Sequence, residues 1–590
     1  MRIYDAFGNR RGLVLSLCVG TGLLAGLAAV GMHALAQWIA EKSALGLPDN
    51  PLLVRWLLPA LPAVGILFCV AVAEILFRKH GYDRSLLAAI RAAREPSARL
   101  PGYHTFMHIL TSGVSVGLGI SAGMEAPSAL TGSAIGYGLA HRLRLPRETV
   151  TLLLSAGAAA GIAAIFGAPL AGTLFACEVL LPSVSAVLLV PILLAAASGM
   201  LVNHYFAVAG HFPTIAYSWQ LRNIWLYALV GLCCGLVSWG VIQLNSVFVR
   251  LASGRLRNPW VRAILGSIVL YAAFLALPAL GGQGYNFISH LLNRAPDMLP
   301  TGGLPMPEDF GVMLLFFLAL TILKPIVSMV SLTAGGDGGM FGPSLTTGAF
   351  LGYAFHLVLL KLNITGFPAI NCIAAGMTGM LAGVMHAPMT GLFLIAEMLG
   401  GYPLLVPLMV VAALSAFISR VGARKNLYFA AANARVTATS ATVVTEAAAD
   451  FQELEAMPVA EFIDRHYFVL NHTDTFATLL KLVVNSRQVL FPVVDANGKL
   501  KGVIDELHIR PFLLRHAELD ALIAEDFMEP VRASIEDTAK LGEAWRIFDE
   551  KRISFLPVLH NGRFEGMLSR SVLLDSSRRY LHIREWIDQQ

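Results

Sequence analysis

The stretch GMEAPSALTGSAIGY at residues 123–137 decides the fold, because the chain contains a second version of it, GMFGPSLTTGAFLGY, at residues 339–353. The two stretches agree at eight of fifteen positions, where unrelated stretches would agree at about one. A second pair follows them, APLAG at residues 168–172 and APMTG at residues 387–391. The chain is therefore a duplicated unit that Gly and Pro interrupt at the same place in each copy, which is typical of a transport site built from broken helices.

The composition is that of a membrane protein. Hydrophobic residues make up 56% of the 590 residues and charged residues 14%, and the mean hydropathy is +0.66, whereas about a quarter of a soluble protein is charged. Runs that are apolar and long enough to span a bilayer occur at residues 12–36, 52–76, 150–175, 184–202, 224–247, 261–280, 312–332 and 404–418. We expect an all-α polytopic membrane protein with two inverted-topology repeats and broken helices.

Basic residues give the orientation of these runs. They precede the first run and follow the second, at Arg2, Arg10, Arg11, Arg78, Lys79 and Arg84. Because such residues favour the cytoplasmic side, we expect two crossings between these flanks and both termini in the cytoplasm. The net charge of +5 is then an orientation signal, and we expect no nucleic-acid partner.

Other function classes lack their motifs in this sequence. The six cysteines all lie in apolar stretches, and none has the spacing of metal ligands. The chain contains neither His-Glu-x-x-His nor Gly-x-Ser-x-Gly. We therefore expect neither an enzyme nor a metal site.

The C-terminal part differs from the rest. From about residue 451 charged residues become frequent, and a second duplication appears, in which FPVV at residues 491–494 and GVI at 502–504 are echoed by LPVL at 556–559 and GML at 566–568. Each copy predicts a strand, a Gly turn and a second strand, preceded by an amphipathic helix. This pattern predicts a soluble tandem of two α/β units.

Glu125 is the decisive residue of the first pore segment. It stands between Gly123 and Pro127 in an apolar region, at the point where a helix should begin. The free amides of a helix N-terminus favour an anion, whereas a carboxylate buried at mid-membrane costs about 2.5 to 3.5 kcal/mol. A carboxylate that occupies an anion site when ionised and leaves it when protonated would act as a gate. The alternative is a carboxylate that merely caps its own helix.

The second pore segment has an aromatic residue where the first has its acid. In Gly339-Met340-Phe341-Gly342-Pro343 the phenylalanine matches Glu125. A helix N-terminus from the other half would then converge on the same anion site, and such a site needs no fixed cation.

On these motifs the chain resembles the CLC family of chloride channels and proton-coupled anion antiporters. The segment around Glu125 is similar to the family's Gly-Arg-Glu-Gly-Pro, the segment around Phe341 to its Gly-x-Phe-x-Pro, and Lys425-Asn426-Leu427-Tyr428 to the end of its last helix. The resemblance implies that Glu125 is the gate and binds protons. It implies that the anion-binding residues are Gly123, Met124, Ala126, Met340, Phe341, Gly342 and Tyr428.

The chain departs from the family at three functional places. In the gate segment, Met124 and Ala126 replace the family's arginine and second glycine. Where the family has a Gly-Ser-Gly-Ile-Pro segment with an anion-binding serine, this chain reads His-Gly-Tyr-Asp-Arg-Ser from residue 80, so we expect Gly81 or Tyr82 to replace the serine. Val179 stands at the position of the family's inner proton-transfer glutamate, with Glu178 adjacent. A valine cannot carry a proton, which favours channel-like or weakly coupled conduction over tight antiport.

The C-terminal tandem resembles a pair of CBS domains, which often bind adenine nucleotides. The acidic residue that typically holds the ribose is replaced by His508 in one copy and Val572 in the other, so an adenine nucleotide between the CBS domains stays an open alternative, and no cofactor is required. We place the membrane domain at residues 1–430, a linker at 431–454, the first CBS domain at 455–515 and the second at 522–585.

The sequence therefore predicts transmembrane chloride transport through a CLC-type pore that Glu125 gates and the CBS pair regulates. The resemblance implies a homodimer in a bacterial-type inner membrane. One alternative is a proton-coupled antiporter for chloride, fluoride or nitrate. Another is a CBS-regulated magnesium transporter, which would require clustered carboxylates in the spans.

Overall fold

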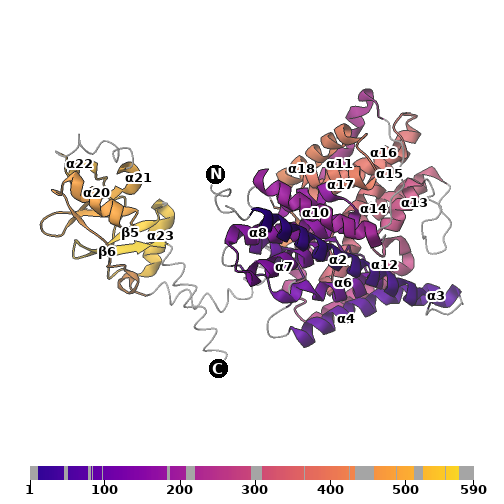
Figure 1. Cartoon of the computed structure of the whole chain (residues 1–590), viewed down its shortest axis with the longest axis horizontal. Helices are drawn as coiled ribbons and strands as arrows, with labels where there is room; N and C mark the ends of the chain where they lie inside the picture. Colours follow the sequence, from indigo (N-terminus) through magenta and orange to yellow (C-terminus); the bar gives the residue numbers. More distant parts are fainter. Residues whose placement is uncertain are drawn as a thin grey trace. The chain divides into compact units, whose positions relative to one another are not determined.

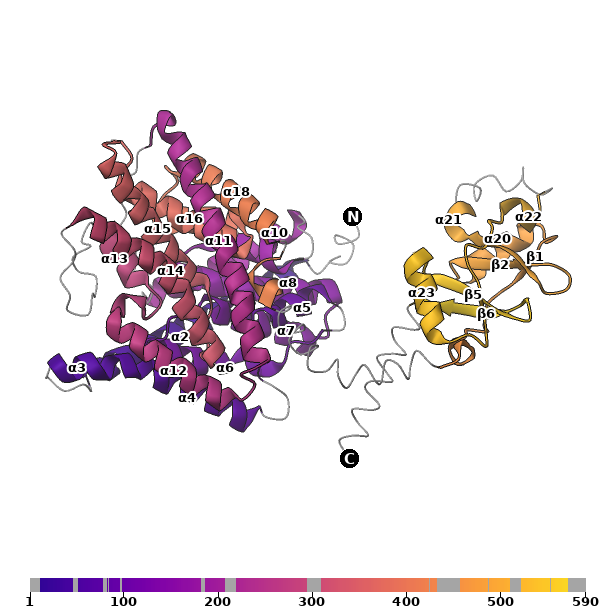
Figure 2. The same ribbon diagram turned by 180° about the vertical axis from the view of Figure 1, so that it is seen from behind.

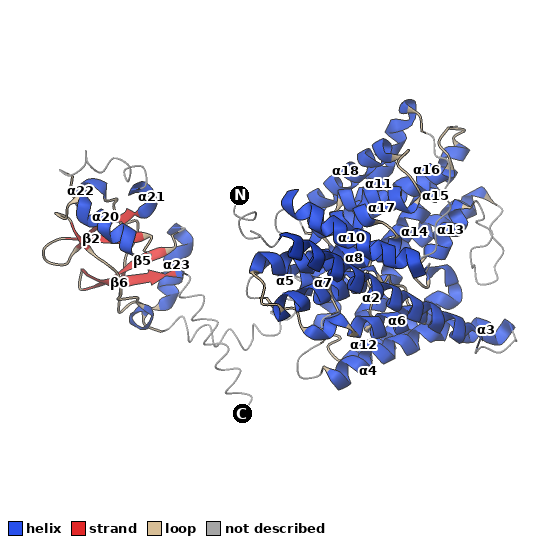
Figure 3. Cartoon of the chain, viewed as in Figure 1, coloured by secondary structure: helices blue, strands red, loops and turns tan. Residues whose placement is uncertain are grey.

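The chain folds into two compact units. A computed structural model describes residues 11–45, 51–77, 82, 84–95, 98–181, 186–206, 219–293, 309–364, 366–423, 425–431, 457–486, 488–509, 522–551 and 553–570. The first unit comprises Met1–Thr439 and the second Ser440–Gln590. The first unit is helical, and the strands lie in the second unit, as Figure 3 shows. The predicted linker at residues 431–454 lies outside the described residues, except for residue 431.

The first unit confirms the predicted polytopic membrane fold. Within the described residues, nine helices are long and apolar enough to cross a membrane: Gly12–Ser43, Val54–Leu76, Arg147–Phe166, Val187–Phe206, Leu221–Ser253, Pro259–Ala276, Phe310–Ala334, Phe341–Lys361 and Leu405–Ala431. Large apolar side chains on their outer faces are exposed, for example Ile75 at 76% and Phe417 at 66%. Faces of this kind suit contact with lipid, since a helix satisfies its own backbone polar groups.

The two sequence repeats form two corresponding series of helices. The first series is α2 (Arg11–Leu45), α3 (Pro51–Leu57), α4 (Leu61–Leu76), α5 (Leu87–Arg94), α6 (Met107–Gly117), α7 (Glu125–Arg142), α8 (Arg147–Phe166), α9 (Pro169–Phe175) and α10 (Ala186–Phe206). The second is α11 (Ile224–Ser253), α12 (Pro259–Ala276), α13 (Tyr285–Leu292), α14 (Phe310–Ala334), α15 (Phe341–Lys361), α16 (Ala369–Met385), α17 (Pro388–Met398) and α18 (Leu405–Gly422). Figures 1 and 2 show the two series as the purple and the pink-to-orange parts of one body.

Glycine pairs let the central helices of each repeat approach closely. A Cβ atom on Gly132 of α7 would collide with the carbonyl oxygen of Gly157 of α8, and one on Gly157 would collide with the carbonyl oxygen of Gly132. Gly348 of α15 and Gly376 of α16 stand in the same reciprocal relation. Small residues of this kind are the usual means of close helix packing in membranes, and here they hold the two pore helices against their neighbours.

One predicted span has the wrong C-terminal bound. The run at residues 150–175 is not a single helix, because α8 ends at Phe166 and Gly167 adopts a left-handed conformation with φ of +66°. The π-helical turn Ala176–Leu180 then continues α9, which begins at Pro169. The second repeat has the same break, with His386 at φ of +55° and Pro388 at the start of α17. The Ala-Pro pairs therefore divide one apolar run into two helices in each half.

The second unit confirms the predicted tandem. Its strands are β1 (Leu470–Asn471), β2 (Leu490–Val494), β3 (Leu500–Asp505), β4 (Ile535–Glu536), β5 (Phe555–His560) and β6 (Arg563–Ser569), in two sheets of order β1-β2-β3 and β4-β5-β6. In each sheet the first pair of strands is parallel and the second is antiparallel. Its helices are α20 (Phe476–Asn485), α21 (Glu506–Ile509), α22 (Ala524–Phe527) and α23 (Leu541–Lys551). Each sheet has its own hydrophobic core.

Candidate functional site

The two pore segments meet through their backbones. Gly123 and Gly339 form an antiparallel bridge, in which the N–H of Gly123 donates to the carbonyl of Gly339 at 2.9 Å and the N–H of Gly339 donates back at 2.8 Å. A Cβ atom on Gly339 would lie 2.7 Å from the Cβ atom of Ala126, so this contact requires glycine. The helices α7 and α15 begin two residues after these glycines, and their N-termini are therefore brought together.

Glu125 lies fully buried where these N-termini meet. It is the first residue of α7, and its side chain has no exposed surface. Its Oε2 accepts a hydrogen bond from the backbone N–H of Gly342 at 3.4 Å, and its Oε1 accepts one from the hydroxyl of Tyr285. The carboxylate thus occupies the positively polarised end of α15, the place at which a helix favours an anion.

Aromatic side chains surround this carboxylate. The ring of Phe341, at the start of α15, lies 5.6 Å from that of Phe166 and 6.2 Å from that of Phe175, measured between centroids. The ring of Tyr285 meets the Phe166 ring edge to face at 5.9 Å. These rings pack together beside Tyr285, whose hydroxyl contacts Glu125.

The remaining residues predicted at the two segments are also buried. The exposed fractions are 1% for Met124, 6% for Ala126 and 3% for Met340, and Gly123 and Gly342 are buried as well. Their backbones lie at the two helix starts, where the N–H of Gly342 contacts Glu125 and the N–H of Gly123 is engaged by the Gly339 carbonyl.

Tyr428 has a buried hydroxyl near Glu125. Its oxygen is buried and has no hydrogen-bond partner among the described residues, and the charge of Glu125 acts on it electrostatically. A buried hydroxyl without a partner is costly. A small anion beside Glu125 would supply the missing acceptor.

The structure describes one of the two predicted serine replacements. Gly81 lies outside the described residues. The Tyr82 hydroxyl donates to Asp337 Oδ2 at 3.2 Å and lies 3.1 Å from the Thr111 hydroxyl, so it belongs to a cluster centred on a carboxylate and not to the contacts around Glu125.

Tyr285 is a site residue that the sequence reasoning missed. It begins α13, directly after Gly281-Gly282-Gln283-Gly284, and this run of glycines in an apolar region was the available signal. The buried Lys324 holds the turn, because its Nζ donates to the carbonyls of Leu280 at 2.9 Å and Gly282 at 2.8 Å. Gly284, with φ of +97°, then directs the tyrosine toward Glu125.

Replacing Tyr285 by phenylalanine should loosen the gate. The ring and its contact with Phe166 would stay, but the hydroxyl that donates to Glu125 would be lost, and a hydrogen bond to a charged group contributes about 1.5 to 3 kcal/mol. We expect anion flux at neutral pH to rise by about tenfold, measured in liposomes that contain the purified chain. Tyr353→Phe, in α15, is the matched control, and unchanged flux in Tyr285→Phe would contradict a restraining role for the hydroxyl.

The environment of Glu178 shows that its carboxylate has a structural role. It accepts hydrogen bonds from the backbone N–H groups of Met389 at 3.0 Å and Thr390 at 2.8 Å, at the start of α17. In the other half, Glu397 accepts from the N–H groups at the start of α9. Val179, the residue after Glu178, is 2% exposed and offers no titratable group.

The alternative of an adenine nucleotide between the CBS domains stays a prediction. Val572 lies outside the described residues, and the side chain of His508 is likewise not described. Within the described ranges, no group of three or more His, Cys, Asp or Glu side chains is arranged to hold a metal ion.

Comparisons with known proteins agree with this architecture. The family model described as voltage gated chloride channel matches residues 64–420, and the CBS domain model matches residues 437–515 and 524–578. The structure of a slow cyanobacterial Cl⁻/H⁺ antiporter is 21% identical, with 72% of this chain and 98% of that chain covered and a TM-score of 0.59.

Two further solved structures are similar. A CLC-type fluoride/proton antiporter is 24% identical over 71% of this chain and 97% of its own, with a TM-score of 0.57. A eukaryotic CLC transporter is 17% identical over 95% of this chain and 97% of its own, with a TM-score of 0.56. At these identities the likenesses show a shared fold.

Proposed function

We infer that this chain, which belongs to the voltage gated chloride channel family, carries a small anion across the membrane through the site where its two pore segments meet. The observation that supports this most directly is the position of Glu125, fully buried with its carboxylate on the Gly342 amide. A group of backbone amides that holds a carboxylate can hold a halide by the same hydrogen bonds.

Glu125 would act as the gate by competing with the transported ion. While it is ionised, its carboxylate occupies the Gly342 amide. When it takes up a proton it loses its charge, which weakens its hold on the helix N-terminus. An anion can then accept hydrogen bonds from that amide and from the Tyr428 hydroxyl. The flux should therefore rise as the pH falls.

We propose that conduction is channel-like or weakly coupled to protons. Val179 cannot bind a proton, and Glu178 is engaged by the start of α17, so neither residue is suited to a second proton step. The similar structures of a Cl⁻/H⁺ antiporter and a fluoride/proton antiporter support tight proton-coupled exchange as the second candidate. Chloride is the proposed ion, with fluoride and nitrate as the alternatives.

An ion-flux assay tests the proposed function. In phospholipid vesicles that contain the purified full chain, we expect efflux of chloride or fluoride to exceed that of K⁺ and Mg²⁺ by at least about tenfold, because the helix N-termini favour negative charge. Protein-free vesicles are the control. Cation efflux without anion efflux would overturn the proposal and support the magnesium-transporter alternative.

The second unit and the assembly complete the proposal. The CBS domains form a compact unit with hydrophobic cores of their own, as a regulatory module requires, and we assign them regulation of anion flux. The chain is an integral membrane protein. We propose that it is a homodimer in a bacterial-type inner membrane with both termini in the cytoplasm, in keeping with the basic residues that flank its first two spans.

A further inference from the structure

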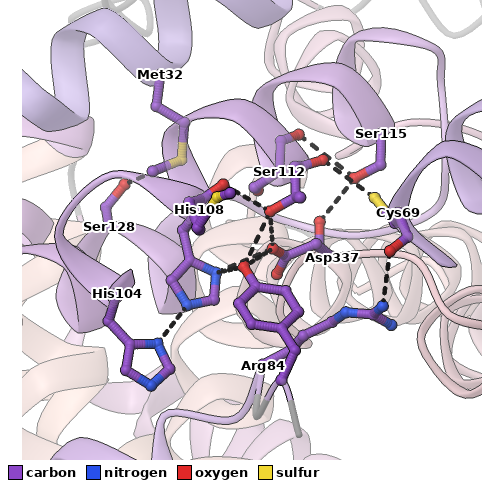
Figure 4. Close-up of polar contacts among 12 residues, drawn as sticks. Met32, Cys69, Arg84, His104, His108, Ser112, Ser115, Ser128 and Asp337 are labelled. Carbon is purple, nitrogen blue, oxygen red and sulfur yellow. Dashed lines mark hydrogen bonds and ion pairs between the residues drawn. The ribbon is translucent and has the colours of Figure 1, made fainter. Parts of the chain in front are cut away.

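A second buried carboxylate lies just before the second pore segment in the sequence. Asp337, in the loop between α14 and α15, is fully buried, and Figure 4 shows His108, Ser115 and Arg84 around it. Its Oδ2 accepts hydrogen bonds from His108 Nδ1 at 2.9 Å, from the Tyr82 hydroxyl at 3.2 Å and from the Thr111 hydroxyl. Donors that converge on one oxygen favour the ionised form of a carboxylate.

Charged and titratable groups of the neighbouring elements face this carboxylate. The positive charge of Arg84, just before α5, acts on Asp337, while its guanidinium donates to the carbonyls of Gly335 at 2.7 Å and Cys69 of α4 at 3.0 Å. Tyr103 packs against His104, with 4.3 Å between ring centroids, and against Tyr82, with 5.6 Å. The positive charges that can compensate a buried Asp337 are therefore His108, when it is protonated, and Arg84.

Two histidines extend from Asp337 as a hydrogen-bonded chain. His108 Nε2 lies 3.0 Å from His104 Nδ1, and the two rings are nearly parallel, at 8°. When both rings are neutral and Asp337 is ionised, the proton of His108 lies on Nδ1, and its Nε2 accepts from Nδ1–H of His104. The Nε2 of His104 then carries a lone pair, and this atom is buried without a partner among the described residues.

The chain of groups is joined to the gate segments at both ends. Asp337 precedes Gly339, the partner of Gly123, by two residues. The Ser115 hydroxyl donates to the backbone carbonyl of Asp337 at 2.9 Å. His104 lies in the 3₁₀ turn Gly102–Thr105, which packs against α7, the helix that begins with Glu125. A change of charge in this cluster therefore occurs within the structure that positions the gate.

We propose that His104, His108 and Asp337 form a proton relay, which supplies the proton transfer that Val179 cannot. A proton binds to Nε2 of His104, the Nδ1 proton of His104 passes to Nε2 of His108, and the Nδ1 proton of His108 passes to Oδ2 of Asp337. Both rings end neutral with the opposite tautomer, and one proton has moved from His104 to Asp337. The relay rests on the proposed anion transport, to which it adds the route of weak proton coupling.

Two other roles account less well for the geometry. A metal site would need ring nitrogens that converge on an ion, whereas the two histidines are hydrogen-bonded directly to each other. A purely structural cluster of Arg84, His108 and Asp337 would not use His104, whose buried Nε2 has no partner in the described part of the chain.

Paired flux measurements test the relay. In liposomes that contain the full chain, a chloride or fluoride gradient should drive a measurable proton flux. We expect His108→Gln and His104→Gln each to lower the ratio of proton flux to anion flux by at least about tenfold, because glutamine keeps a donor and an acceptor but cannot pass a proton between them. His141→Gln, in the last turn of α7, is the matched control and should keep the ratio.

Several outcomes would overturn the relay. An unchanged ratio in His104→Gln would do so even if His108→Gln fails to fold, because the relay begins at His104. A wild-type chain that moves anions but no protons would also exclude it. Nitrogen-15 NMR of the histidine rings should show His104 protonated on Nδ1, and protonation on Nε2 alone would contradict the relay independently of transport. Absence of all anion flux would instead overturn the proposed function, with the NMR result still deciding the relay.

Discussion

Replacing Glu125 by glutamine is expected to raise anion flux at neutral pH and to remove its pH dependence. Glutamine has the size and neutral charge of the protonated acid, so it cannot occupy the Gly342 amide as an anion. In the wild type, titration of one carboxylate changes the open fraction by up to about tenfold per pH unit, whereas we expect less than about a twofold change over the same range in the variant. The measurement is chloride and fluoride efflux from liposomes between about pH 4.5 and 7.5.

The control for this experiment is Glu148→Gln. Glu148 is an exposed carboxylate in the first turn of α8, so its loss changes the charge of the same membrane unit without touching the pore segments. It should leave the pH profile as in the wild type. If Glu125→Gln keeps a steep pH dependence, a different group gates the pore, and the assignment of Glu125 is wrong.

The combination with Tyr285 makes the test sharper. The Tyr285 hydroxyl donates to Glu125 Oε1, and the two residues come from different repeats. If this contact is how the tyrosine restrains the gate, Tyr285→Phe should add little to the flux of Glu125→Gln, because the charged partner is already gone. Additive effects would mean that the two residues act separately.

The main fold and the position of the two pore segments could be predicted from sequence because the sequence contains an internal repeat. The pore segments around Glu125 and Phe341 resemble each other, and an internal repeat indicates spatial equivalence without any knowledge of packing. The break at Gly167 had the same kind of signal in the repeated Ala-Pro pairs. It was missed because an apolar run of the right length outweighed two residues.

Single residues that meet across long sequence distances were not predictable in this way. His108 and Asp337 come from α6 and from the loop before α15, and neither residue type is repeated: at the offset of the pore segments, the other repeat has Lys324 and Ser121. Tyr82 was assigned to the anion because its segment lacks the serine, whereas the structure shows its hydroxyl on Asp337. Nothing in the order of residues indicates that a second buried carboxylate competes for that hydroxyl.

Each half also places a carboxylate on a helix start of the other half. The sequence repeat contains both glutamates but does not show this pairing. Glu178 of the first repeat accepts from the N–H groups of Met389 and Thr390 and from the Thr390 hydroxyl at 2.7 Å. Glu397 of the second repeat accepts from the N–H groups of Leu170 at 3.0 Å and Ala171 at 2.8 Å. Each carboxylate thus caps a short helix of the opposite half, whose first amides have no partner within their own helix.

Glu178→Ala and Glu397→Ala should therefore destabilise the membrane unit more than the removal of an exposed charged side chain does. Each change leaves two helix-start amides without their charged acceptor, and we expect a loss of about 2 to 4 kcal/mol in the free energy of unfolding after allowing for partial exposure. Thermal unfolding of the detergent-solubilised chain would measure it. Glutamine at either position keeps one acceptor oxygen and should give an intermediate loss, and Glu41→Ala, on the exposed face of α2, should give almost none. If both alanine variants unfold at the wild-type temperature, the exchanged caps do not hold the two repeats together, and the close packing of α9 against α17 must do so alone.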